Sequence, residues 1–257
     1  MFAARGTVEP TAPGGRPVRW AATSRLGGTS LAPYDSLNLA GYVGDAPAAV
    51  AANRARVAQA LGLEPDRVCL MDSVHGADIA AVDAGGVIPG VDALVTSTPG
   101  LALVALGADC VPMALVGADG MTAVAAHCGW RGLVADVVEV AVQALRDRGT
   151  DVALAVLGPA VCGQCYPVPA DRAEEVRAVR SDAVSRAALL VTADGQPGID
   201  VRAGLRRRLV ELDVAPAAIL TVGGCTVEDP RLFSYRREGI TGRQGMAVLV
   251  DAPDHNG

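Results

Sequence analysis

The chain has 257 residues, of which 51% are hydrophobic and 19% charged, the composition of a folded globular protein with a substantial core. The net charge of −6 offers no basic surface for nucleic acid, and the absence of lysine excludes P-loop and Schiff-base mechanisms. The longest apolar runs are too short to cross a bilayer, and the N-terminus lacks a signal-peptide core. We therefore expect a cytoplasmic protein with reduced cysteines.

The predicted elements alternate between strands and helices along one chain without a linker. Residues 1–15, rich in Pro, Gly and Thr, are expected to be flexible, and residues 252–257, which include His255, to form a tail. Short runs rich in Val, Leu and Ala predict strands over 18–23, 67–73, 101–109, 121–127, 152–158, 217–223 and 245–250. Helical patterns cover 46–61, 133–148, 169–180 and 200–212. The order predicts a single α/β domain over 16–251, with a mixed sheet where strands follow one another directly.

Three potential metal ligands lie where predicted strands give way to loops. His75 follows one strand, Cys110 comes directly after the next, and His127 closes a third. Two imidazoles and a thiolate suit zinc, with copper as a second option. Spacing alone leaves two alternatives open, a Cys110/His127 nucleophile pair without metal and scattered core residues.

The segment that follows His127 has the features of an anion site. Arg131 stands between two glycines before a predicted helix, and a helix N-terminus attracts anions that arginine grips with two hydrogen bonds. Trp130 is expected to pack the helix onto the sheet.

The remaining cysteines are assigned from their positions. Cys162 and Cys165 in CGQC predict a structural loop near the site, with a redox pair and a second metal site as alternatives. Cys128 is expected to point away from His127 in a strand, Cys225 to pack beside the site and Cys69 to lie in the core.

The chain resembles the bacterial laccase-domain family, also called the polyphenol oxidase or peptidoglycan-editing-factor family. The resemblance rests on seven segments that run in order from about Ser24 to Gly245: SRLGGTS…YDSLNLAGYVGD, DSVHGADI, DALVTSTPGLAL, GADCVP, AAHCGWRG, LGPAVCGQCYPV and LFSYRREGITGRQG. It implies a single domain of three layers, α/β/β, with one metal, usually zinc, bound by His75, Cys110 and His127.

The resemblance also implies an activity and a set of substrate contacts. Members are described as purine nucleoside phosphorylases that act on adenosine, inosine, guanosine and methylthioadenosine and also deaminate adenosine. Because arginines must hold the attacking phosphate, the candidate substrate-binding residues are Arg25, Arg131, Arg236 and Arg243. Asn38 resembles the family's substrate-contacting asparagine.

Three positions depart from the family pattern. Ser73 stands where glutamine is common, Tyr42 where histidine is frequent and Pro167 where an acid often follows the tyrosine. If that acid is a general acid or base, Asp109 or Glu238 would have to replace it.

Other functions remain alternatives. One is a cytoplasmic hydrolase of peptidoglycan precursors, either zinc-dependent or with Cys110 as nucleophile and His127 as base. Another is a non-enzymatic role as a binding partner in cell division. Multicopper oxidation is disfavoured because it needs more histidines than the three present. The expected partners are a purine nucleoside and phosphate, without nucleic acid or membrane, and the expected state is a monomer or weak dimer.

Overall fold

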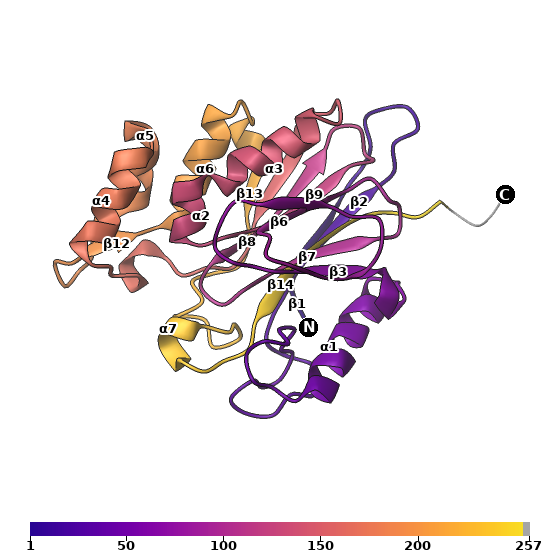
Figure 1. Cartoon of the computed structure of the whole chain (residues 1–257), viewed down its shortest axis with the longest axis horizontal. Helices are drawn as coiled ribbons and strands as arrows, with labels where there is room; N and C mark the ends of the chain where they lie inside the picture. Colours follow the sequence, from indigo (N-terminus) through magenta and orange to yellow (C-terminus); the bar gives the residue numbers. More distant parts are fainter. Residues whose placement is uncertain (254–257) are drawn as a thin grey trace.

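Two six-stranded sheets pack face to face at the centre of the computed structural model, which describes residues 1–253 (Figure 1). The first sheet has the order β1 (Phe2–Val8), β2 (Val18–Thr23), β14 (Gln244–Val250), β7 (Ala102–Gly107), β3 (Val68–Asp72), β5 (Gly86–Pro89). The second has the order β13 (Ile219–Thr221), β10 (Val152–Leu157), β8 (Val111–Gly117), β9 (Ala123–Cys128), β6 (Ala93–Thr96), β4 (Ile79–Ala81). A separate pair joins β11 (Leu189–Val191) to β12 (Pro197–Ile199).

Both large sheets are mixed, as the sequence predicts. In the first sheet β3 runs parallel to β5 and β7, whereas β14 is antiparallel to β2 and β7. In the second, β10–β13 and β4–β6 are parallel and the central pairs are antiparallel. The chain crosses directly from the first sheet to the second between β7 and β8, so residues 108–110 lie at the shared edge.

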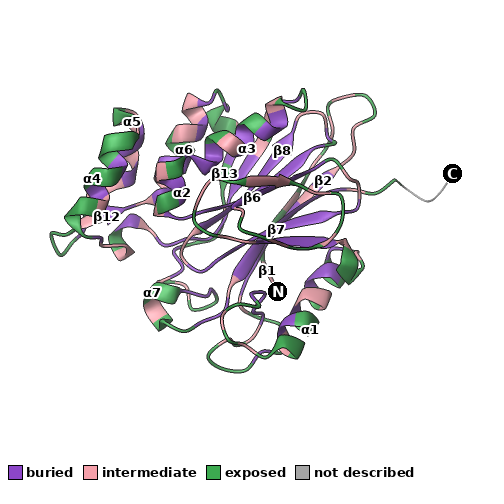
Figure 2. Ribbon diagram, in the orientation of Figure 1, coloured by how far each residue is buried: buried purple, intermediate pink, exposed green. Residues whose placement is uncertain are grey.

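Helices cover the outer faces of both sheets, while the central strands are buried (Figure 2). The outer face of the second sheet is covered by α2 (Trp130–Ala135), α3 (Val137–Arg146) and α6 (Val201–Glu211), and α4 (Ala170–Val179) and α5 (Asp182–Ala188) lie beside these helices and extend the same hydrophobic core. α1 (Pro47–Ala60) packs on the outer face of the first sheet, and α7 (Tyr235–Glu238) precedes β14. The predicted α/β/β layers are therefore present, and α1 adds a further layer.

Successive side chains of β9 point alternately into two different hydrophobic cores. Val124, Ala126 and Cys128 pack against the helices, whereas Ala123 and Ala125 belong to the core between the sheets. His127 therefore faces the opposite way from Cys128, which confirms the predicted orientation of Cys128. Cys69 also lies in the core between the sheets, as predicted.

The N-terminal segment differs from the flexible stretch expected over 1–15. Residues 2–8 form β1, an edge strand antiparallel to β2. Its residues alternate between intermediate and exposed, so the half-buried edge lacks the continuous apolar run typical of a central strand. Gly6 allows the ring of Trp20 to lie against the strand, since a Cβ there would come within 2.7 Å of that ring.

The helix predicted over 133–148 is broken into α2 and α3 at Asp136. Asp136 adopts a left-handed conformation with φ of 64°, which aspartate tolerates better than most residues. Its carboxylate forms ion pairs with Arg180 and with Arg208, at 2.8 Å from the Nη2 atom of Arg208. Arg208 is thus only partly exposed, whereas the adjacent Arg206 and Arg207 are exposed.

Other short elements escaped prediction from the sequence. They include β4, β5, β6, β8 and α5. Asp45, just before α1, accepts hydrogen bonds from Ser30, Asn38 and the Ala46 N–H, and Ala46 occupies the cap position. Among the described residues, none of the helices is long and apolar enough to span a bilayer.

Candidate active site

His75, Cys110 and His127 come together at the edge where the two sheets meet. One ligand atom from each lies within 4.8 Å of the others, and the two imidazole rings meet edge to face with centroids 4.8 Å apart. His75 is exposed in the loop after β3, Cys110 is half-buried just before β8 and His127 is buried in β9. The structure thus brings together the three side chains selected from the sequence, and their donor set fits a zinc or copper ion.

The local backbone is shaped to bring these ligands close. His75 and Asp109 both have positive φ, at 64° and 97°, a costly conformation for residues with a side chain. Gly129 leaves the space they need, because a Cβ there would lie 2.9 Å from Cys110 Sγ and 3.1 Å from His75 Nδ1. The glycine after His127–Cys128 therefore serves the ligand cluster by having no side chain.

Asp92 positions two of the three ligands, His75 and His127, through hydrogen bonds. It is fully buried, and its Oδ1 atom accepts hydrogen bonds from His127 Nδ1 at 3.0 Å and from the His75 N–H at 2.9 Å. Its Oδ2 atom accepts from the Gly76 N–H at 2.7 Å and the Val74 N–H at 3.3 Å. Burial raises the pKa of Asp92, but the bonds from His127 and Gly76 outweigh it and the net pKa is lowered. An ionised Asp92 fixes the His127 tautomer so that Nε2 is free to bind a metal.

Cys110 and His127 form a charged pair in the metal-free protein. Burial raises the pKa of Cys110, but the charges and hydrogen bonds of His127 and His75 lower it to about 6. Burial lowers the pKa of His127, whereas Cys110 and Asp92 raise it to about 9. A thiolate beside an imidazolium is therefore the favoured state near neutral pH, and it supplies the deprotonated sulfur that a metal or a nucleophilic mechanism requires.

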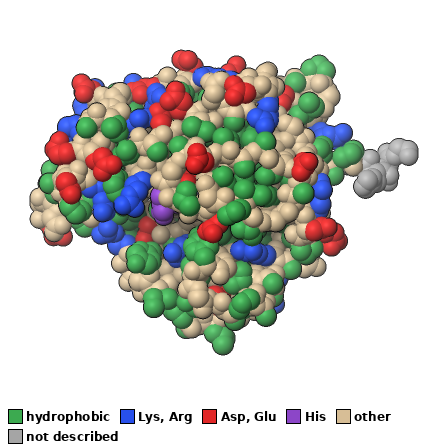
Figure 3. Space-filling view, viewed as in Figure 1, with side chains coloured by type: hydrophobic (Ala, Val, Ile, Leu, Met, Phe, Trp, Pro, Cys, Tyr) green, Lys and Arg blue, Asp and Glu red, His purple; other side chains and the backbone are tan. Residues whose placement is uncertain are grey.

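A pocket of about 450 Å³ opens over these three residues. Arg172, Arg236 and Arg243 line it, and among residues 1–253 none of their guanidinium groups forms an ion pair. Aromatic rings line it as well, and the Arg236 guanidinium lies 4.6 Å from the centroid of the Tyr166 ring. Figure 3 shows histidine at the surface of this face beside a group of arginines. The arrangement offers positive charge and flat apolar surface together.

Two of the predicted substrate-binding residues, Arg25 and Asn38, do not line this pocket. Arg25 donates hydrogen bonds to the Asp35 carbonyl at 2.8 Å and to Glu238 at 2.6 Å. Asn38 is fully buried, and its amide bonds Ala40, Asp45 and the Arg243 N–H. Both side chains form hydrogen bonds within the protein, and their contact with a substrate stays a prediction.

The predicted anion site at Arg131 is also different in the structure. Arg131 is exposed, stacks on Trp130 with its guanidinium carbon 5.1 Å from the ring centroid, and does not line the pocket. The helix it enters, α2, has only six residues. Arg236 and Arg243 do line the pocket, and Arg172 joins them on the other face of the site. Trp130 packs against the core beneath the helices, as predicted, and also borders the pocket.

The two acids considered as general acid or base are both engaged by the protein. Asp109 lines the pocket, but its carboxylate accepts hydrogen bonds from Thr226 at 2.6 Å, Ser234 at 2.7 Å and the Arg236 N–H at 2.7 Å. Glu238 lies outside the pocket and bonds Arg25 and Arg237. Asp109 therefore fastens the C-terminal segment to the site, and Glu238 is held by Arg25 and Arg237.

The departures from the family pattern fall unevenly around the pocket. Tyr42 and Ser73 line it, whereas Pro167 does not and instead forms an isolated bridge with Gly198. Burial raises the pKa of Tyr42, and the positive charge of Arg243 opposes that rise. Two of the three unusual residues are thus in position to contact a bound molecule.

Three contributors were missed from the sequence. Asp92, in VDALV, looks like an ordinary turn acid, and Arg172 is one of several arginines in the predicted helix over 169–180. Tyr166 falls within the recognised CGQCYPV segment, which was weighed only for its cysteines. The available signal for Asp92 was an acid immediately before the apolar run 93–95.

Comparisons with known proteins place these features in a family context. Residues 19–251 match the family described as multi-copper polyphenol oxidoreductase laccase. A Streptomyces coelicolor protein named purine nucleoside phosphorylase SCO2081 is 48% identical over 234 residues, covering 89% of this chain and 94% of its own. A Mycobacterium tuberculosis protein named purine nucleoside phosphorylase Rv2149c is 44% identical over 238 residues, covering 91% and 92%.

Solved structures share the fold. YlmD from Geobacillus stearothermophilus superposes with a TM-score of 0.85 at 31% identity, covering 91% of this chain and 92% of its own. The hypothetical protein YfiH of Bacillus licheniformis gives a TM-score of 0.86 at 27% identity, covering 91% and 93%. The two-sheet architecture is therefore common to this chain and these relatives.

Proposed function

The chain belongs to the family described as multi-copper polyphenol oxidoreductase laccase, and from this we propose that it is a metal-dependent purine nucleoside phosphorylase that also deaminates adenosine. The relatives named purine nucleoside phosphorylase support the first activity. The proposed substrates are adenosine, inosine, guanosine and methylthioadenosine, each with inorganic phosphate.

The observation that carries the proposal is the group of three arginines over the ligand cluster. Phosphorolysis brings a multiply charged phosphate to C1′ of the ribose, and its oxygens need fixed positive charge. Arg172, Arg236 and Arg243 provide that charge, and none is neutralised by a carboxylate within residues 1–253. We assign phosphate to these side chains and the flat purine to the rings of Tyr42, Tyr166 and Tyr235, which line the same pocket.

In phosphorolysis, a phosphate oxygen forms a bond to C1′ as the bond from C1′ to the purine nitrogen breaks. The purine leaves with the bonding electron pair and takes up a proton, which gives free base and ribose 1-phosphate. In deamination, water adds at C6 of adenosine and ammonia leaves, which gives inosine. The same pocket serves both reactions in this proposal because both substrates present a purine nucleoside.

The proposed metal site consists of His75, Cys110 and His127, with zinc as the first choice and copper as the second. Its fit rests on the convergent donor atoms, the lowered pKa of the Cys110 thiol and the Asp92 carboxylate bonded to His127 Nδ1. A metal bound there supplies Lewis acidity toward an oxygen atom in the pocket. Asp92 orients His127, Gly129 leaves room for the ligands, and the three arginines hold the anion.

A second candidate is the hydrolase of peptidoglycan precursors, favoured by one specific observation. Cys110, His127 and Asp92 are arranged as nucleophile, base and orienting acid, and the pKa of Cys110, which burial would raise, is lowered to about 6 by His127 and His75. In that case the thiolate attacks an acyl carbon and His127 donates a proton to the leaving amine. Copper-dependent phenol oxidation is not proposed, because only His75 and His127 remain once His255, outside the described residues, is set aside.

The test uses purified protein with adenosine, in the presence and absence of phosphate. We expect adenine and ribose 1-phosphate only with phosphate, and inosine under both conditions. The His75→Ala variant is the control for contaminating host enzymes. Products equal to those of the control would refute the proposal. Activity on muropeptides in chelator-treated protein, abolished by Cys110 alkylation, would favour the hydrolase.

A further inference from the structure

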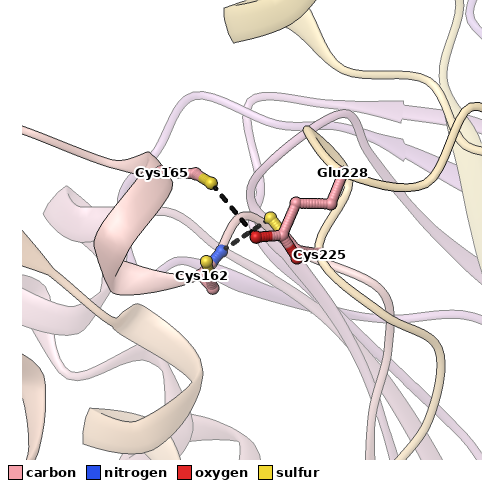
Figure 4. A group of neighbouring side chains, drawn as sticks. All are labelled: Cys162, Cys165, Cys225 and Glu228. Atoms are coloured by element: carbon pink, nitrogen blue, oxygen red, sulfur yellow. Dashed lines mark hydrogen bonds between the residues drawn. The ribbon is translucent and has the colours of Figure 1, made fainter.

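A second group of ligand-type side chains lies outside the site described above. Cys162, Cys165, Cys225 and Glu228 each offer one ligand atom, and these atoms all lie within 4.8 Å of one another (Figure 4). Cys225 is buried, the other two cysteines are half-buried and Glu228 is exposed at the rim. Figure 4 shows the four side chains pointing toward one another from two separate segments of the chain.

Each segment contributes two ligands three residues apart. In the first, the Cys165 N–H bonds the Cys162 carbonyl at 3.1 Å across the short 3-10 turn Gly163–Cys165. In the second, the Glu228 N–H bonds the Cys225 carbonyl at 3.2 Å. Both are tight turns that place the first and last side chain on the same side. The spacing of both pairs, with two residues between the ligands, is that of the C-x2-C segments from which structural zinc sites are built.

Backbone contacts hold the two turns against each other. Ala160 and Cys225 form a parallel bridge, the Thr226 N–H bonds the Ala160 carbonyl at 3.1 Å, and the Cys162 N–H lies 3.4 Å from Cys225 Sγ. The ligand cluster is therefore built by long-range structure between residues 160–165 and 225–228. Surface side chains that lie close together by chance would have no such backbone contacts between their segments.

We propose that Cys162, Cys165, Cys225 and Glu228 form a second metal site, which binds zinc in tetrahedral coordination. Zinc bonds to sulfur at about 2.3 Å, so ligand sulfurs in a tetrahedron lie about 3.8 Å apart. The observed limit of 4.8 Å is close enough for side-chain rotation alone to close the site. Zinc bound there would hold the three cysteines as thiolates, and sites of this kind select zinc over magnesium or calcium.

A redox role fits these residues less well. Reactive C-x2-C pairs lie at the start of a full helix, whose N-terminus stabilises the thiolate. Here Cys162 precedes a turn of only three residues. A dithiol pair also gives no reason for Cys225 and Glu228 to converge on the same point.

The proposed second site is connected to the pocket at both of its segments. Tyr166, next to Cys165, lines the pocket. Thr226, next to Cys225, donates a hydrogen bond at 2.6 Å to Asp109, which itself precedes Cys110. Zinc at the second site would hold these two loops together, so its role is structural and its ligands are positioning residues.

The experiment measures zinc per chain in a background that lacks the first site, the double variant His75→Ala/Cys110→Ala. We expect this background to retain about one zinc per chain and to lose it when Cys162→Ser and Cys225→Ser are added. The matched control is Cys69→Ala, a buried cysteine between the sheets, which should retain the metal. Glu228→Gln should weaken zinc binding at least about tenfold, since even indirect ligand contacts are worth that much.

A second measurement keeps the test valid if the cysteine variants fold poorly. In the same background, Co²⁺ should give strong sulfur-to-cobalt charge-transfer absorption, and the three cluster thiols should react with a thiol reagent only after a chelator is added. Retention of no zinc, with freely reacting thiols before chelation, would overturn the proposal. A disulfide in place of metal after purification under reducing conditions would overturn it too. Because the first site is absent from this background, neither result depends on the proposed enzyme activity.

Discussion

Replacing Asp92 by asparagine tests whether the acid behind His127 sets the metal site. The substitution keeps the size and shape of the side chain but replaces one acceptor oxygen by an NH2 group. In the protein, Oδ1 faces His127 Nδ1 and the His75 N–H, and Oδ2 faces the Gly76 and Val74 N–H groups. Whichever way the amide turns, two donors therefore face another donor.

The cost can be worked from these four contacts. If the amide oxygen stays toward the histidines, the variant loses the 2.7 Å bond from Gly76 and the weaker 3.3 Å bond from Val74. A hydrogen bond to a buried charged group contributes about 1.5–3 kcal/mol, so we expect unfolding free energy to fall by about 2–4 kcal/mol. Loss of the charge that faces His127 Nδ1 should weaken zinc binding by about 10–100-fold, as for other carboxylates that hydrogen-bond to a metal-binding histidine.

Two assays separate these effects. Denaturant unfolding of the zinc-free protein measures stability, and competition with a chromophoric chelator measures zinc affinity under conditions where both proteins are folded. Asp78→Asn is the matched control, because Asp78 is an exposed acid in the loop that carries His75 and its substitution removes the same charge. If Asp92→Asn binds zinc within about twofold of the parent protein, the assignment of Asp92 as the orienting group is wrong.

Three further predictions concern the pocket and the ligands. Arg236→Ala should raise the KM for phosphate by about tenfold or more, because a charge-assisted contact to phosphate is lost. The control variant Arg186→Ala, which changes an exposed arginine, should leave the KM unchanged. Equal phosphate kinetics in the two variants would contradict the assignment. In zinc-free protein, the rate of Cys110 alkylation should rise with pH through a midpoint at about 6, because the pKa of Cys110 is lowered and the thiolate exists above that pH. A midpoint near ~8.5, the ordinary pKa of a cysteine thiol, would refute the pairing with His127. Gly129→Ala should weaken zinc binding by about tenfold or more while the protein still folds, because the added Cβ would lie too close to Cys110 and His75. Calorimetric titration with zinc measures the affinity. An unchanged affinity would show that Cys110 and His75 move aside without cost and that the glycine is not needed.

The parts of the fold that were predictable are those where one residue pattern determines the environment. β2 matches its predicted range, 18–23, and α1, α4 and α6 lie within one residue of theirs at each end, because buried strands and helix faces leave direct composition signals. β1 was missed because an edge strand buries only half of its residues. The break at Asp136 was missed because its cause, the pairing with Arg180 and Arg208, lies far away in the chain.

The candidate site divides in the same way. His75, Cys110 and His127 could be selected because histidine and cysteine are rare in the chain and stand at strand ends. Arginine is common, so residue type alone could not separate Arg236 and Arg243, which line the pocket, from Arg25, which bonds Glu238 behind it. Which arginine is free depends on where the acids lie, and that is decided by the tertiary structure.

Asp109 explains how the pocket depends on segments far from the ligands. Its backbone lies between β7 and β8, where the chain passes from one sheet to the other, and its neighbour is Cys110. Its carboxylate bonds Ser234 and the Arg236 N–H from the segment before β14, and Thr226 from the loop of the proposed second metal site. The positive φ of Asp109, at 97°, directs that carboxylate toward these partners and costs folding energy. Because one strained residue joins the anion-binding arginine, the cysteine loop and the ligand thiol, movement in any of these segments must alter the other two.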